Sequence, residues 1–132
     1  MRKLEIRLTV VILFACLAGC GSGHLQVTRI QLGRSLNPDN TVASFTTVFA
    51  PTDTIYLTAF TTGVGTGTIS VRWMYGSQVI GEPKKQVTSR IDAVTEFPLQ
   101  SAGGFPPGDY TAEVFLDGQS AGTRSFRVEK PR

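Results

Sequence analysis

The spacing of apolar residues after residue 24 restricts the fold of this chain more than any other feature. From that point on, apolar residues occur in short runs in which they alternate with polar ones, and the runs are separated by Gly, Pro, Asn and Asp. Nowhere in this part do apolar residues recur at helical spacing over three turns. Alternation with a period of two, interrupted in this way, is typical of an all-β sandwich or barrel.

The clearest predicted strands are residues 54–62 and 68–75, in which every second residue is apolar or aromatic over most of the run. Residues 63–67 (GVGTG) are predicted to be a flexible connection between them. Asp117-Gly118 predicts a hairpin turn near the end of the chain. Further strands are expected at residues 25–32, 78–80, 94–99 and 110–116 and around Phe126 and Val128, with a short apolar run at residues 45–49.

Four sequence features give this pattern a familiar arrangement: Trp73 in a mid-chain strand, Gly108-Asp109-Tyr110 at the entry to a late strand, Asp117-Gly118, and Phe126-Arg127-Val128. Residues 45–130 therefore resemble the immunoglobulin-like and fibronectin-III-like domains of bacterial surface proteins. The resemblance implies an antiparallel β-sandwich of about seven strands, with the Trp at its centre and the Tyr in a tyrosine corner. No cysteine pair brackets the Trp, so the core has to hold without an inter-sheet disulfide.

The first nineteen residues have the composition of a signal peptide. Basic residues lead into an eleven-residue apolar run at residues 8–18, in which Thr9 is the only polar residue. A transmembrane helix needs roughly 20 apolar residues, so the run is too short to span a bilayer but has the length of a signal-peptide core.

The apolar run ends in Leu17-Ala18-Gly19-Cys20. This resembles the lipobox of bacterial lipoproteins, in which an aliphatic residue and two small ones precede a cysteine. The resemblance implies cleavage after Gly19, diacylglycerol on the Cys20 thiol and acylation of the new N-terminus. An ordinary secretory signal cut beside a chance cysteine is the alternative. The lipid on Cys20 is the only covalent group expected, and no cofactor or metal is predicted.

The sequence therefore predicts a signal peptide at residues 1–19, a lipidated cysteine and tether at 20–24, a strand and loop at 25–44, and a sandwich domain at 45–130. The expected location is the bacterial cell envelope. In enterobacterial lipoproteins an Asp after the cysteine tends to retain the protein in the inner membrane, so Gly21 favours the outer membrane by resemblance.

The charge of the expected mature chain gives no reason to bind nucleic acid. The formal net charge of +3 belongs largely to the first nineteen residues, and residues 20–132 carry ten basic and nine acidic groups. Nucleic-acid affinity comes mainly from clustered Lys and Arg. Lys84-Lys85, a two-residue basic patch, is interpreted as a charged strand edge that discourages strand addition.

The residues needed for catalysis are not grouped in the sequence. The expected domain has no cysteine, and the only histidine, His24, lies in the tether. The carboxylates are scattered and form no calcium-loop pattern. Residues 63–67 lead into a predicted strand rather than a helix, so they do not form a phosphate-binding loop. The sequence therefore predicts a protein that is not an enzyme.

One surface is predicted to bind a partner. If Trp73 and Tyr110 face inward, the residues that alternate with them on the two strands face outward, and in an immunoglobulin-like topology these strands are neighbours. Aromatic, Met and Arg side chains are enriched in protein interfaces. The predicted face comprises Arg72, Met74, Glu113, Phe115 and Arg127, and Tyr56 with Phe60 forms a weaker pair on the other sheet.

Three functions are weighed from these features. The first is a lipid-anchored, non-catalytic binding or structural module whose partner is an envelope protein or surface glycan. The second is an accessory subunit of an envelope assembly, such as a secretion, pilus or adhesion system, which a long apolar edge strand would favour. The third, a hydrolytic enzyme, would need a cleft with two carboxylates or an Arg-carboxylate pair.

Overall fold

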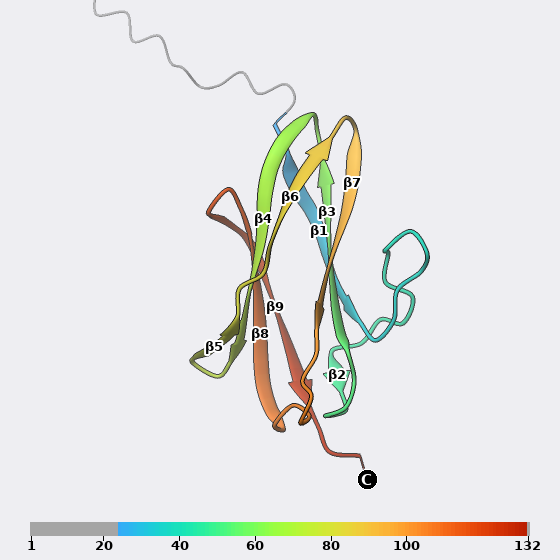
Figure 1. The fold of residues 1–132 in the computed structure, drawn as a ribbon, viewed down its shortest axis with the longest axis vertical. Coiled ribbons are helices and arrows are strands. Elements are labelled where there is room, and N and C mark those ends of the chain that lie inside the picture. Colours follow the sequence, from blue (N-terminus) through green and yellow to red (C-terminus); the bar gives the residue numbers. More distant parts are fainter. Residues whose placement is uncertain (1–23, 132) are drawn as a thin grey trace, which may run out of the picture.

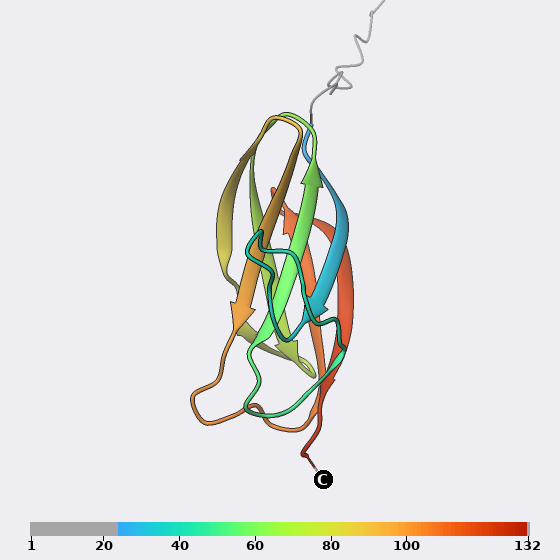
Figure 2. The ribbon, with the colours of Figure 1, turned by 90° about the vertical axis from the view of Figure 1, so that its right-hand side faces the viewer.

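A computed structural model describes residues 24–131, and in this part of the chain it contains nine strands and no helix. The strands form two facing sheets, which Figure 1 shows as two layers, whereas Figure 2 looks onto the smaller sheet. The strands are β1 (Gln26–Gly33), β2 (Val48–Phe49), β3 (Ile55–Thr62), β4 (Gly65–Tyr75), β5 (Gln78–Gly81), β6 (Lys84–Ser89), β7 (Asp92–Leu99), β8 (Gly108–Leu116) and β9 (Gln119–Val128).

The smaller sheet has the order β1-β3-β7, and the larger has the order β2-β9-β8-β4, with β5 and β6 both paired to β4. Neighbouring strands are antiparallel except β2, which runs parallel to the end of β9. The predicted all-β, immunoglobulin-like sandwich is confirmed, with two more strands than the seven expected.

The core lies between the sheets and is built around aromatic rings. Trp73 of β4 is completely buried, and its ring meets that of Phe126 edge-on at a centroid distance of 5.9 Å. Tyr110 stacks on Phe126, with 5.3 Å between the ring centroids. Ile55, Leu57 and Ala59, Ile69 and Val71, Phe97, and Ala112 and Val114 are completely buried around them. The alternation that predicted these strands therefore comes from burial of one face of each.

Tyr110 forms the predicted tyrosine corner. Its hydroxyl donates a hydrogen bond to the carbonyl of Pro106, four residues upstream, at 2.5 Å. The ring stacks on Tyr75 at 4.6 Å, and burial raises the pKa of the Tyr110 phenol. The bond fixes the chain where it enters β8 from the preceding loop, as in other immunoglobulin-like sandwiches.

The sandwich begins earlier in the chain than residue 45, where its boundary was expected. β1 pairs with β3 along its length, and residues 34–47 fold back over the outer face of the smaller sheet. There Val42 is buried, and the Thr58 hydroxyl donates to the Asn40 carbonyl at 2.9 Å. Gly33 permits this close approach, because a Cβ at this position would overlap the Ser44 carbonyl. Residues 25–44 are therefore an integral part of the domain.

Strand β6 was not predicted, and it changes the interpretation of the two lysines. Lys84 is exposed, as expected of a charged edge. Lys85 instead points between the sheets, where its ammonium donates to a Glu96 carboxylate oxygen at 2.7 Å and to the Glu96 carbonyl at 2.6 Å. It also lies 5.3 Å from the centre of the Phe97 ring. Lys85 therefore links β6 of one sheet to β7 of the other along the open side of the sandwich.

Two further predictions concern the N-terminal region and the connection before β4. β4 starts at Gly65, so the connection predicted at residues 63–67 is shorter than expected, because Gly65 to Gly67 pair with β6.

The predicted lipobox, Leu17 to Cys20, lies outside the described residues. Among residues 24–131 there is no helix with the length and apolar character needed to cross a bilayer.

Candidate partner surface

The outer face of the larger sheet brings four of the five predicted surface residues together. β4 and β8 are antiparallel neighbours, and Arg72 is directly opposite Glu113 in the register. Phe115 is opposite Ser70, one step further along β8 on the same face, and Met74 is opposite Thr111. All four point away from the core, because their sequence neighbours Val71, Trp73 and Val114 are completely buried.

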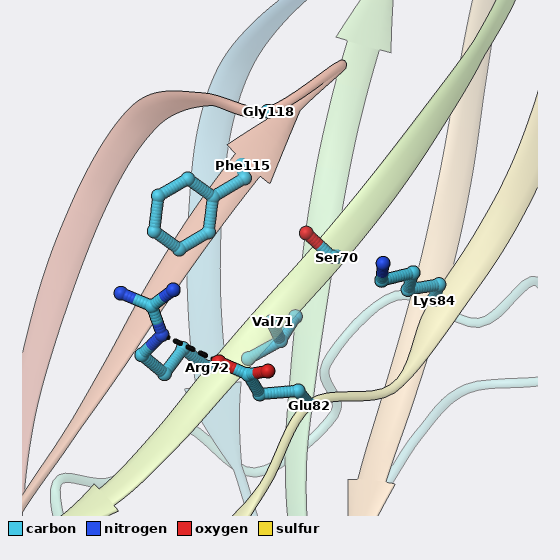
Figure 3. Close-up of a pocket in the computed structure, with 7 residues that line it drawn as sticks. All are labelled: Ser70, Val71, Arg72, Glu82, Lys84, Phe115 and Gly118. Carbon is cyan, nitrogen blue, oxygen red and sulfur yellow. Dashed lines mark hydrogen bonds and ion pairs between the residues drawn. The ribbon is translucent and has the colours of Figure 1, made fainter. Parts of the chain in front are cut away.

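Arg72 is held in place by two neighbours (Figure 3). Its Nε donates to a Glu82 carboxylate oxygen at 2.6 Å, and its guanidinium lies 4.9 Å from the centre of the Phe115 ring. The hydrogen bond to Glu82 raises the pKa of Arg72, whose guanidinium is charged at any physiological pH. Its two terminal nitrogens have no hydrogen-bond partner among residues 24–131 and remain able to donate.

A shallow cavity of about 200 Å³ lies beside this guanidinium. Ser70, Glu82 and Lys84 contribute its polar groups, and Phe115 contributes an apolar side, as Figure 3 shows. Neither Glu82 nor Lys84 was predicted as a site residue. They belong to one short segment, in which Glu82 lies in the connection after β5 and Lys84 is the first residue of β6. Only the pairing of β4 with both β5 and β6 brings that segment beside Arg72. The site can hold a carboxylate or hydroxyl group next to a flat apolar surface.

Glu113 and Met74 flank the Arg72 cluster. Glu113 accepts a hydrogen bond from the Ser120 hydroxyl at 2.7 Å, which joins β8 to β9 on this face. Met74 is partly exposed and extends the apolar area toward the far end of β4. Its flexible thioether can adapt to the shape of an apolar partner group.

Arg127 shares the outer face but does not join the cluster. It pairs in the β8–β9 register with Asp109, four residues before Glu113, so it lies roughly 13 Å along the strand from the Arg72 row. Its guanidinium forms ion pairs with Asp109 at 3.3 Å and Glu129 at 3.7 Å. The structure therefore places Arg127 at the opposite end of the face.

The weaker aromatic pair on the smaller sheet is divided by the segment that folds over it. Tyr56 and Phe60 lie two steps apart on β3, and Thr58 between them is completely buried beneath the segment that contains Asn40. Phe60 instead packs against Arg29 of β1, with 4.3 Å between the guanidinium carbon and the ring centre. These two aromatic residues do not form a continuous surface.

The described residues also show how the titratable groups are distributed. Within residues 24–131, no cluster of three or more His, Cys, Asp or Glu side chains is placed to hold a metal ion. Three of the carboxylates serve the fold: Asp53 accepts from the Ala50 amide, Asp117 from the Thr68 amide, and Asp39 from Thr41. The bonds from Thr41 lower the pKa of Asp39. Asp beside turns commonly plays this structural part.

Two facing sheets, a buried central Trp73 and a tyrosine corner at Tyr110 define the domain as an immunoglobulin-like β-sandwich. The structure is similar to that of an immunoglobulin-like protein from Pseudomonas aeruginosa, with a TM-score of 0.57 and 13% sequence identity. The match covers 83% of this chain and 99% of that protein. No protein-family model and no curated protein matches the sequence.

Two larger proteins contain a similar sandwich as one part. A β-glucosidase from Listeria innocua, solved with glucose, matches with a TM-score of 0.52 and 8% identity over 80% of this chain and 16% of the enzyme. An alkylpurine DNA glycosylase from Pseudomonas fluorescens, bound to DNA, matches with a TM-score of 0.51 and 9% identity over 81% of this chain and 31% of the enzyme. At these identities the likeness concerns the fold alone.

Proposed function

We propose that this chain is a lipoprotein of the bacterial cell envelope and that its sandwich acts as a non-catalytic binding or structural module. Of the two membranes, the outer one is the proposed location. The observation that carries the proposal is Leu17-Ala18-Gly19-Cys20 at the end of a short apolar run. β1 starts at Gln26, six residues after the cysteine, so the folded domain would follow the anchor almost directly.

The proposed anchor determines how such a module works. One acyl chain binds a membrane only marginally, whereas two or three chains, at about 0.8 kcal/mol per buried methylene, hold a protein there stably. Confinement to the membrane surface raises the effective concentration of the domain for partners on the same surface. A binding face of modest intrinsic affinity then suffices.

The partner that best fits the surface is an envelope protein. The free terminal nitrogens of Arg72 suit a carboxylate, and Phe115 and Met74 offer apolar contact beside it. Arg, Met and aromatic side chains at the centre of an interface contribute most of its binding energy. A surface glycan is the other ligand this combination of hydroxyl, charge and ring could hold.

A second candidate is an accessory subunit of an envelope assembly in a secretion, pilus or adhesion system. It is favoured by a groove of about 540 Å³ between β1 and β9, lined by Ile30, Leu32 and the exposed ring of Phe45. Of β9, only Arg127 and Val128 pair with β2. The rest of its outer edge could receive a strand of a partner.

Replacing Cys20 with serine is expected to abolish membrane association, because the hydroxyl cannot form the thioether that carries the diacylglycerol. Wild-type protein should incorporate a palmitate analogue and enter the detergent phase on phase separation, whereas C20S should do neither. Cys16→Ala is the matched control, since it removes the other cysteine, in the apolar run, and should leave labelling intact. Unlabelled wild-type protein that stays in the aqueous phase would contradict the anchor.

Replacing Met74 and Phe115 together with serine is expected to reduce partner capture about tenfold, the size of effect typical of residues central to an interface. Capture is measured by crosslinking in the native envelope, followed by mass spectrometry of the captured proteins. Tyr56→Ser with Phe60→Ser changes an aromatic pair on the other sheet and serves as the control. If both double variants remain folded and capture the same partners as the wild type, the proposed face is wrong.

A further inference from the structure

We infer that the end of the sandwich next to the N-terminus is a membrane-contacting tip, with Val64 and Ile91 inserted into the lipid interface. This inference rests on the proposed lipid anchor at Cys20. The tip is defined as the β3–β4 connection, residues 63–64, and the β6–β7 connection, residues 90–91.

The two connections are adjacent, and each joins a strand of one sheet to a strand of the other. The Gly63 amide donates to the Ile91 carbonyl at 2.8 Å, and the Thr62 hydroxyl donates to the same oxygen at 3.3 Å. Figure 1 shows both turns side by side at the end of the molecule where β1 begins. The tip is therefore one surface formed by both sheets.

The tip exposes two large aliphatic side chains. Ile91 is 75% exposed, the highest value among the large apolar residues described as exposed, and Val64 is 58% exposed. A single exposed apolar residue is normal on a protein surface. Two β-branched residues at the apex of adjacent turns are instead suited to enter the boundary between headgroups and acyl chains.

The position of the proposed anchor selects a lipid surface as the occupant of this tip. The His24 carbonyl lies directly against Gly63, where a Cβ would collide with it, so the first described residue is part of the tip. Cys20 precedes it by four residues, which span at most about 14 Å when fully extended. The lipid on Cys20 would thus hold Val64 and Ile91 within reach of the headgroups.

The charges at the tip are compatible with this contact. Arg90 is exposed beside Ile91 and can meet lipid phosphates, and Asp92, the next residue toward β7, is exposed as well. A close balance of charge imposes little repulsion from an anionic surface. The contact would place the long axis of the sandwich away from the membrane, with the Arg72 face on its side and open to partners.

The test uses nitroxide spin labels on single cysteines in the lipidated full-length protein. The mature chain offers no other free thiol, because Cys16 lies in the cleaved segment and Cys20 carries the lipid. Val64→Cys and Ile91→Cys place labels at the tip. Val79→Cys places the control label on β5, at the other end of β4 and 47% exposed before substitution. The protein is reconstituted into vesicles of phosphatidylethanolamine and phosphatidylglycerol.

Power-saturation measurements then compare collisions with oxygen, which concentrates in lipid, and with a water-soluble nickel complex. The two tip labels should be more accessible to oxygen than to nickel, and the β5 label should show the reverse. If the protein floats with the vesicles but all three labels favour nickel, the tip inference is overturned and the anchor stands. If labels at the tip show dipolar broadening and exclude both reagents, a second copy covers the tip, and the inference is again overturned. Protein that does not float with the vesicles overturns the proposed function itself.

Discussion

Replacing Trp73 with alanine is expected to lower the free energy of unfolding by about 3–5 kcal/mol, as for other large aromatic residues removed from a core. The indole is completely buried on β4 and meets Phe126 edge-on, so truncation leaves a cavity between the two sheets. A domain of this size is typically stable by only about 5–15 kcal/mol, so the substitution removes a large share of the free energy of unfolding. Denaturant unfolding followed by circular dichroism measures the change.

Trp73→Phe is the matched control for this experiment. The indole Nε1 is buried without a hydrogen-bond partner among the described residues, and a buried donor left unpaired is costly. Phenylalanine keeps most of the ring contacts and removes that donor, so its effect should be clearly smaller than that of alanine. Equal destabilisation by the two substitutions would show that packing around the ring is not what Trp73 contributes.

Replacing Gly33 with alanine is expected to destabilise the domain by about 1–3 kcal/mol, the usual cost of forcing an extra methyl into a packed position. The new Cβ would overlap both the Ser44 carbonyl and a methyl group of Val42. One of these contacts is with backbone, which cannot rotate away as a flexible side chain can. Residues 34–47 should therefore lift from the smaller sheet, which limited proteolysis would detect as new cleavage in this segment.

Gly103→Ala isolates the steric effect at Gly33. A Cβ at Gly103 meets no atom within 4 Å, so the same chemical change should alter stability by only a few tenths of a kcal/mol. If G33A and G103A have the same unfolding midpoint and the same cleavage pattern, the close approach of residues 34–47 does not depend on Gly33.

The sequence predicted the strands whose inner face is apolar and whose outer face is polar. β3 and β4 were predicted from alternating apolar residues, and the structure shows these alternating residues completely buried. The same alternation predicted which way the side chains of Arg72 and Phe115 point. Their positions side by side on the sheet required a known topology, and the immunoglobulin-like resemblance supplied it.

The elements that were missed lack this periodicity. In β6 only Val87 is a buried aliphatic residue, and the inward position two residues before it is taken by Lys85. The inward side chain can be charged because its carboxylate partner, Glu96, comes from the opposite sheet, and sequence gives no sign of that contact. The first seven residues of β9, QSAGTRS, are exposed or only partly buried, so they too show no alternation.

The candidate surface was predictable only in part, for the same reason. Arg72, Glu113, Phe115 and Met74 belong to two regular strands, whereas Glu82 reaches Arg72 from a short connection. Arg127 was expected in the same group because it also points outward, but the β8–β9 register places it beside Asp109 instead. The hairpin at Asp117-Gly118 fixes this register, so the distance from the turn decides which residue of β8 Arg127 faces. The prediction used only the face on which Arg127 lies and not that distance.

If the chain is anchored through Cys20 as proposed, Lys85 has a consequence for copies held at high density on a membrane. Copies that diffuse in two dimensions meet side by side. Their sheets could then pair through the free edges of β6 and β7 and form one continuous sheet. A charged side chain that points inward from an edge strand is one of the features by which sheets resist edge-to-edge pairing, and Lys85, held by Glu96 across the two edges, is such a side chain. The same contact that closes one side of the sandwich would thus keep crowded neighbours as separate molecules.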